Sequence, residues 1–181
     1  MLFRSCPNVE AGGLEFGQDP VQAAAVTSEV RRKTGLPFTV KVTPNVGDIR
    51  PIARAVEDAG ADAITVVNTI PSMAIDIRRR RPVLATTFGG LSGPAIKPVA
   101  LRLVYLTAGV TTIPILAAGG VSSGTDAIEF FMAGASAVQV GTATFRDPQT
   151  PWRVLQEITD WCDAEGVRNL HEIIGAARPH D

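Results

Sequence analysis

A cysteine followed by a proline lies close to the start of the chain, in the stretch Ser5-Cys6-Pro7-Asn8. A thiolate can act as a nucleophile or a base, whereas a buried thiol is only a small hydrophobic group. The amide of Asn8 offers a hydrogen-bond donor and an acceptor, although asparagine is also common in turns. These residue types allow a reactive thiol beside a polar binding group, and they equally allow a structural cysteine followed by a turn.

Other polar residues and glycines follow the strands that we expect. Asn68-Thr69, Gly119-Gly120 and Gly141-Thr142 each close a predicted strand, and Lys41 lies near the end of another. In a (β/α)8 barrel such positions share the C-terminal face, where active sites form. The loops after the last two strands often bind phosphate through backbone N–H groups, which glycine lets approach closely. We therefore predict a phosphate site there, although a glycine at a strand end can also be only a turn residue.

Short apolar runs alternate along the chain with longer amphipathic stretches. We expect strands at 38–42, 62–69, 113–120 and 136–143, with a further short strand at 1–5. We expect helices at 20–33, 48–60, 97–108 and 123–134, and more helix after 147. Apolar strands that alternate with helices indicate a parallel sheet buried on both faces. The predicted fold class is α/β, a (β/α)8 TIM barrel of which this chain supplies about four to five βα units.

Local capping signals mark the helix starts. Asp19-Pro20 and Asp147-Pro148 each place a side-chain acceptor before a proline, and Asp48 precedes an amphipathic stretch. Ser123 and Asp126 have the spacing of a capping box. Each of these positions is therefore expected to begin a helix.

Composition excludes several classes of partner. The net charge of −1 gives no reason to expect a nucleic acid, and no apolar run approaches the roughly 18 residues of a membrane helix. Without an export signal, we expect a cytoplasmic protein in which Cys6 and Cys162 stay reduced. His171 and His180 have no partner at ligand spacing, so we expect no metal site. The basic run at 78–82 is interpreted as a solvated insertion.

Long blocks of the chain resemble the class 1 dihydroorotate dehydrogenases. These blocks are SCPNVEAGGLEFGQDP, VKVTPNV, VVNT, GGLSGPAIKPVALR and AAGGVSSGTDAIEFFMAGASAVQVGTA. The glycine loop of the first block and the tail WCDAEGVRNLHEIIG are most similar to class 1B, the catalytic subunit of the NAD-linked enzyme. The resemblance implies an FMN-binding (β/α)8 barrel that oxidises dihydroorotate to orotate in pyrimidine biosynthesis.

The resemblance also implies a role for individual residues. Cys6 matches the catalytic base, which would take a proton from C5 of the substrate while a hydride leaves C6 for the flavin. Asn8, Asn68 and Thr69 match substrate-binding positions, whose amide and hydroxyl groups suit the N–H and C=O edge of a dihydropyrimidine. The positions that match FMN contacts are Lys41, Val67, Gly93, Gly119, Gly120, Gly141 and Thr142.

Class 1B membership implies partners as well as a cofactor. The resemblance predicts a homodimer that works with a separate electron-transfer subunit carrying FAD and an iron–sulfur cluster. This chain has neither a dinucleotide fingerprint nor a cysteine cluster that could hold such a centre. NAD would therefore be reduced only through the partner subunit.

The resemblance covers the C-terminal portion of the family's barrel. A (β/α)8 domain needs roughly 250 residues, and we expect the 181 residues to form a single domain without the family's first three strands and most of the fourth. The start also differs, because Phe3 stands where the family has an asparagine. Two alternatives remain open: a related flavin-dependent dihydropyrimidine dehydrogenase, against which the class 1B blocks argue, and an inactive fragment of the barrel.

Overall fold

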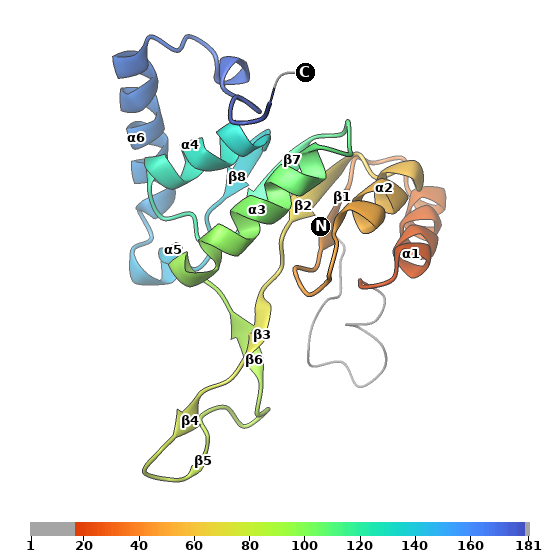
Figure 1. The fold of residues 1–181 in the computed structure, drawn as a ribbon, viewed down its shortest axis with the longest axis vertical. Helices are drawn as coiled ribbons and strands as arrows, with labels where there is room; N and C mark the ends of the chain where they lie inside the picture. The colour runs from red at the N-terminus through yellow and green to blue at the C-terminus, as the bar shows by residue number, and fades with distance from the viewer. Residues whose placement is uncertain (1–16, 180–181) are drawn as a thin grey trace.

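Four parallel strands form the main sheet of the computed structural model, which describes residues 17–179. They are β1 (Thr39–Val42), β2 (Ala63–Val66), β7 (Ile115–Ala118) and β8 (Ala137–Gln139). Their order in the sheet, β1-β2-β7-β8, follows the order in the chain (Figure 1). Consecutive parallel strands joined by helices are the arrangement of a (β/α)8 barrel, so the predicted fold class is confirmed. The expected strand at 1–5 lies outside the described residues.

The two faces of the main sheet differ in composition, because successive side chains of a strand point to opposite faces. One face carries the buried apolar side chains of Val40, Val42, Ile64, Val66, Ile115 and Ala117. The other face carries Lys41, Thr65 and Leu116, which are partners in the strand register. Across this second face, Thr65 Oγ1 lies 3.1 Å from Thr39 Oγ1 and accepts a 3.5 Å hydrogen bond from Gln139. The second face is thus partly polar.

Helices cover the apolar face of the sheet (Figure 1). The helices of the described residues are α1 (Pro20–Lys33), α2 (Arg50–Asp58), α3 (Lys97–Ala108), α4 (Gly124–Ala133), α5 (Ala143–Arg146) and α6 (Thr150–Glu165), with the 3-10 turns η1 (Pro94–Ile96) and η2 (Leu170–Glu172). Helices α2, α3 and α4 contact the strands, while α1 packs on α2 and α6 packs on α4. Phe130 of α4 is the largest of the side chains that are fully buried in the core between these elements.

Two of the predicted capping signals are confirmed. Asp19 caps α1 by accepting a hydrogen bond from the backbone N–H of Val21 at 2.9 Å. Ser123 and Asp126 form a reciprocal capping box at the start of α4. Each aspartate or serine acceptor satisfies a backbone donor that the first turn of a helix leaves unpaired.

The other two predicted helix starts are wrong by two or three residues. The Asp48 carboxylate accepts from the backbone N–H and the guanidinium of Arg50, which forms a turn before the helix, and α2 begins at Arg50. Asp147 is extended, with φ −147° and ψ 106°, and it ends the short helix α5 that the sequence pattern did not predict. Helix α6 begins at Thr150, where Pro151 fills the first turn.

Strands β2, β7 and β8 are also shorter than expected at their carboxyl ends, whereas β1 ends at Val42 as expected. Hydrogen bonds continue briefly beyond β2, from Val67 N to Ala118 O at 2.9 Å and from Asn68 N to Val42 O at 3.0 Å. The chain then leaves the sheet, so Asn68 lies just after the strand instead of in it. The same is true of Gly119 after β7 and of Gly141 after β8. These residues therefore line the edge of the sheet.

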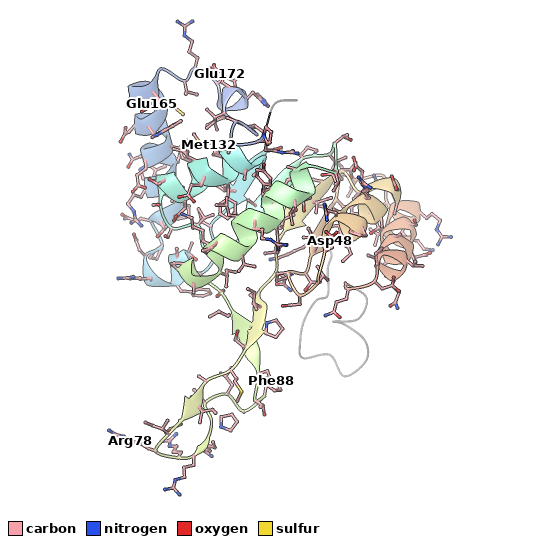
Figure 2. The ribbon with its side chains drawn as sticks, in the orientation of Figure 1. Asp48, Arg78, Phe88, Met132, Glu165 and Glu172 are labelled. Atoms are coloured by element: carbon pink, nitrogen blue, oxygen red, sulfur yellow. The ribbon has the colours of Figure 1, made fainter. Side chains whose placement is uncertain are left out.

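Residues 70–91 form an arm that extends away from the main sheet (Figure 1). It consists of two antiparallel ribbons, β3 (Ile70–Ser72) with β6 (Gly89–Leu91) and β4 (Ile75–Asp76) with β5 (Arg81–Pro82). Figure 2 shows Arg78 at the end of this arm and Phe88 along it. The basic run is exposed, as predicted, but the ribbons were not predicted because strands of two or three residues leave no periodic pattern.

Two features of the described residues bear on the expectations from composition. No helix within residues 17–179 is both long enough and apolar enough to cross a membrane. Cys162 of α6 is half-buried and packs against the hydrophobic core. Burial and the nearby carboxylates of Asp163 and Glu172 raise the pKa of this thiol, so it is a poor nucleophile.

Candidate functional site

A pocket of about 190 Å³ lies at the carboxyl ends of the four parallel strands. Its walls come from β1, from the loops after β2, β7 and β8, and from the segment that joins the arm to α3. The lining residues are Lys41, Val67–Thr69, Ser92–Pro94, Ile96, Ala118–Val121 and Gln139–Ala143. Segments far apart in the sequence thus meet at one edge of the sheet, as expected for the carboxyl ends of neighbouring parallel strands.

The pocket brings together the described residues that the sequence singled out. They are Lys41, Val67, Asn68, Thr69, Gly93, Gly119, Gly120, Gly141 and Thr142. Their proximity was predicted, whereas their individual roles remain predictions. Cys6 and Asn8 lie outside the described residues.

Two polar side chains of the lining were not singled out from the sequence, Ser92 and Gln139. Ser92 Oγ accepts a 2.8 Å hydrogen bond from Thr142 Oγ1, which joins the root of the arm to the loop after β8. Gln139 was detectable as a polar residue within the otherwise apolar strand AVQV. Ser92 lies in a loop motif, and serine in a loop carries no signal that distinguishes binding from turn formation.

The turn Gly119–Gly120 has room only for glycine. The φ angles are 139° and 84°, which favour glycine over any L side chain. A Cβ added at Gly119 would lie 2.8 Å from the Cβ of Ala100, and one at Gly120 would lie 2.7 Å from the Cβ of Lys97. The turn therefore packs directly on the first turns of α3, which fixes the direction of its backbone.

The glycine at position 141 is different, because a Cβ there would meet no atom within 4 Å. The residue is exposed and lines the pocket. Packing inside the protein therefore does not require glycine at this position. A ligand that approaches the backbone closely would require it, since a side chain would occupy the space that the ligand needs.

Lys41 is the cation that lines this pocket among the described residues. It is half-buried on the partly polar face of the sheet, beside Thr65 of β2 in the register. Burial lowers the pKa of Lys41 from its ordinary value. An anionic group bound in the pocket would therefore gain a favourable interaction with a poorly solvated ammonium group.

A cluster of charged side chains on α3 and α4 holds the loop after β7 by hydrogen bonds. Lys97 Nζ donates to Asp126 Oδ1 at 2.6 Å and to Glu129 Oε1 at 2.8 Å. The other oxygen of Asp126 accepts from the backbone N–H groups of Ser122 and Ser123, at 2.9 Å and 3.0 Å. Burial acts to raise the pKa of Asp126, but the hydrogen bonds from Lys97 and Ser122 outweigh it and lower the pKa to about 2.

This shift predicts that stability depends on pH below 5. A carboxyl group whose pKa falls from 3.8 to about 2 on folding contributes about 2 kcal/mol that is complete above pH 5 and is lost as pH falls toward 2. Replacing Asp126 with Asn should therefore cost stability at pH 6, and the difference from the wild type should shrink toward pH 2. Urea unfolding at several pH values measures this difference in unfolding free energy. Asp160→Asn, at an exposed aspartate, is the control. A difference that does not change with pH would contradict the assignment.

The chemistry that the pocket can perform follows from its lining. Backbone glycines and the Thr142 hydroxyl suit an oxyanion such as a phosphate, and Lys41 suits a delocalised negative charge. Asn68 and Thr69 offer donors and acceptors to a polar ring. Within residues 17–179, no three His, Cys, Asp or Glu side chains lie together as a metal site would require.

Comparison with known proteins agrees with this geometry. Residues 2–161 match the family model described as dihydroorotate dehydrogenase. The chain is 52% identical over 171 residues to a protein of Alkaliphilus oremlandii named "Dihydroorotate dehydrogenase B (NAD(+)), catalytic subunit", covering 94% of this chain and 57% of that protein. It is 49% identical over 174 residues to the "Putative dihydroorotate dehydrogenase A (fumarate)" of Solibacter usitatus, covering 96% and 57%.

A solved structure shares the fold. The crystal structure of DHODH in complex with ferulenol from Eimeria tenella superposes with a TM-score of 0.79 at 26% identity, covering 97% of this chain and 53% of that one. The chain therefore spans little more than half the length of the relatives that it matches.

Proposed function

The chain belongs to the dihydroorotate dehydrogenase family, and we propose that it forms the C-terminal part of a barrel that oxidises dihydroorotate to orotate with FMN. The observation that supports this proposal most directly is the meeting of nine predicted positions around one pocket at the carboxyl ends of the strands. Sequence blocks alone place these residues in a family, whereas their convergence on one cavity is a separate requirement of a shared binding site.

The described residues fit the phosphate end of FMN. Gly141 leaves open space where a Cβ would stand, and the Gly119–Gly120 turn is fixed against α3. We propose that these glycines, with Gly93 and Thr142, hold the phosphate through the backbone, while Lys41 and Val67 contact the ring. When bound, FMN would accept the hydride that leaves C6 of the substrate.

The substrate must lose a proton from C5 in the same oxidation. We propose that Cys6 takes this proton, because the family resemblance assigns that role to its position and a thiolate is a competent general base. Asn8, Asn68 and Thr69 are proposed to bind the substrate, so that the ring is held with C5 toward the thiolate. Thr69 and Asn68 both lie at the root of the arm, directly after β2.

A direct test uses a completed chain, in which the N-terminal segment of the Alkaliphilus oremlandii relative precedes this sequence. Under anaerobic conditions, dihydroorotate should bleach the bound flavin and yield orotate. Dihydrouracil in a parallel reaction distinguishes the alternative dihydropyrimidine dehydrogenase. Bleaching by dihydrouracil alone would support that alternative, and a completed barrel that binds flavin but reacts with neither substrate would support an inactive one.

A substitution at Gly141 tests the proposed phosphate site, called the phosphate cradle below, which is formed by Gly93, Gly119, Gly120, Gly141 and Thr142. We expect Gly141→Ala to weaken FMN binding to the completed chain at least tenfold, because the new methyl group enters space that the phosphate needs, while the melting temperature stays unchanged. Gly35→Ala is the matched control, since a Cβ at Gly35 also meets no atom within 4 Å but Gly35 does not line the pocket. Titration followed by flavin fluorescence measures the FMN affinity of both variants. Equal affinity in the two would contradict the proposal that Gly141 contacts the phosphate.

The electron acceptor is proposed to be NAD, reached through a separate electron-transfer subunit of a homodimeric enzyme. This follows the relatives of Alkaliphilus oremlandii and Desulforamulus reducens, both named as NAD-linked catalytic subunits. We expect the reduced, completed chain to transfer electrons to NAD only when the electron-transfer subunit of the Alkaliphilus oremlandii enzyme is added. The absorbance of NADH follows the reaction. Rapid reduction of NAD by the chain alone would contradict this, and rapid reoxidation by fumarate would favour the type named for the Solibacter usitatus relative.

A further inference from the structure

Lys97 packs against the Gly119–Gly120 turn of the proposed phosphate cradle but does not line the pocket. Among the described residues that line the pocket, Pro94 and Ile96 come from the same segment as Lys97, but Lys97 itself does not. Its side chain is 20% exposed and is bound by two carboxylates, so it is not oriented toward a ligand. A cation in this place can still act on the cradle through the residues that it holds.

Two sets of contacts connect Lys97 to the loop after β7. A Cβ at Gly120 would lie 2.7 Å from the Cβ of Lys97 and 3.0 Å from its backbone nitrogen, so the turn rests on this residue. The other end of the loop is held by Asp126, whose carboxylate accepts hydrogen bonds from the backbone N–H groups of Ser122 and Ser123. The same carboxylate forms an ion pair with the ammonium group of Lys97. Both ends of residues 119–123 are thus tied to one lysine.

We propose that Lys97 is a positioning residue that fixes the Gly119–Gly120 turn for phosphate binding, and so makes the site prefer a phosphorylated flavin over riboflavin. This inference rests on the proposed function. Its physical basis is that backbone donors bind an anion strongly only when they are oriented before the anion arrives. A loop tied to α3 through its glycines and to α4 through Asp126 meets that condition.

Removing the ammonium group should loosen the loop. In Lys97→Met, the carboxylates of Asp126 and Glu129 lose the cation that they share, and their mutual repulsion would move Asp126 away from the Ser122 and Ser123 amides. We expect amide hydrogen exchange of Ser122 and Ser123 in the ligand-free chain to become at least tenfold faster. The amide of Val104, in the core of α3, should exchange as in the wild type.

Binding gives the second measurement, made on the 181-residue chain itself by NMR titration with FMN and with riboflavin. We expect the wild type to bind FMN more tightly than riboflavin, and Lys97→Met to lower this preference at least fivefold with riboflavin affinity unchanged. Lys97→Arg, which keeps a donor for both carboxylates, should restore the preference. Lys33→Met, at an exposed lysine near the end of α1, is the control.

A double variant separates positioning from charge. Lys97→Met with Glu129→Gln removes one positive and one negative charge, so the net charge beside the cradle equals that of the wild type. Recovery of the FMN preference in the double variant while the Ser122 and Ser123 amides still exchange fast would mean that charge alone acts, and it would overturn the inference. An equal loss of affinity for both flavins in Lys97→Met would also overturn it, because that result indicates general destabilisation.

The proposed function and this inference can fail separately. A wild-type chain without any preference for FMN over riboflavin would count against the phosphate cradle. In that case, the exchange rates of Ser122 and Ser123 still decide whether Lys97 holds the loop. Unchanged exchange in Lys97→Met would overturn the positioning role whatever the flavin result.

Discussion

Replacing Cys6 with alanine is expected to lower the rate of dihydroorotate oxidation by the completed chain by about 10²–10⁴-fold, the usual effect of removing a general base. The C5 proton of the substrate would then have to leave to water. FMN should remain bound, because its proposed contacts come from other residues. Stopped-flow measurement of flavin bleaching under saturating dihydroorotate gives the rate, and the flavin spectrum gives the occupancy.

Cys162→Ala is the matched control for this experiment. Cys162 is the other cysteine of the chain, and it lies half-buried in α6, where its pKa is raised by burial. Removing it should leave the rate within a factor of two or so, because a raised pKa leaves little thiolate at neutral pH. Turnover by Cys6→Ala near that of the wild type would exclude Cys6 as the base, and loss of flavin in the same variant would indicate a structural role.

Replacing Phe130 with alanine is expected to cost about 3–5 kcal/mol of unfolding free energy, the range for truncating a buried aromatic side chain. Phe130 is fully buried in α4 between the sheet and its neighbouring helices. Its ring is therefore surrounded by core atoms that cannot fully collapse into the space left behind. Urea unfolding of the 181-residue chain, followed by circular dichroism, measures the change.

Phe145→Ala serves as the comparison, because the same substitution is made at a side chain that is 93% exposed on α5. It should change the unfolding free energy by less than about 0.5 kcal/mol. A similar effect of the two substitutions would mean that the helices do not pack on the sheet as described. A small effect of both would place Phe130 outside the stabilising core.

Local sequence signals determined the helices that have strong caps. Asp19 before Pro20 and the Ser123–Asp126 pair each satisfy a backbone donor by contacts within a few residues, so neighbouring residues suffice to specify the start. Asp48 and Asp147 accept from the backbone N–H two residues on, as Asp19 does, yet their helices begin two and three residues after them, at Arg50 and Thr150. The same short-range bond is thus made at different distances from a helix start, and the surrounding backbone decides where the helix begins.

The sequence by itself also determined the parallel βα order, the family and which strand ends carry polar residues or glycines. The tertiary structure decided what those glycines contact. Gly120 must be glycine because α3 lies against it, whereas Gly141 faces open space, and nothing in the residue type distinguishes the two. Likewise, Lys97 and Asp126 are 29 positions apart in the chain, so their 2.6 Å ion pair arises only when α3 and α4 pack side by side. Residues close together in the chain determine the helix caps and the order of strands and helices along it. Contacts between elements that are far apart in the chain form only when the sheet and its helices pack together.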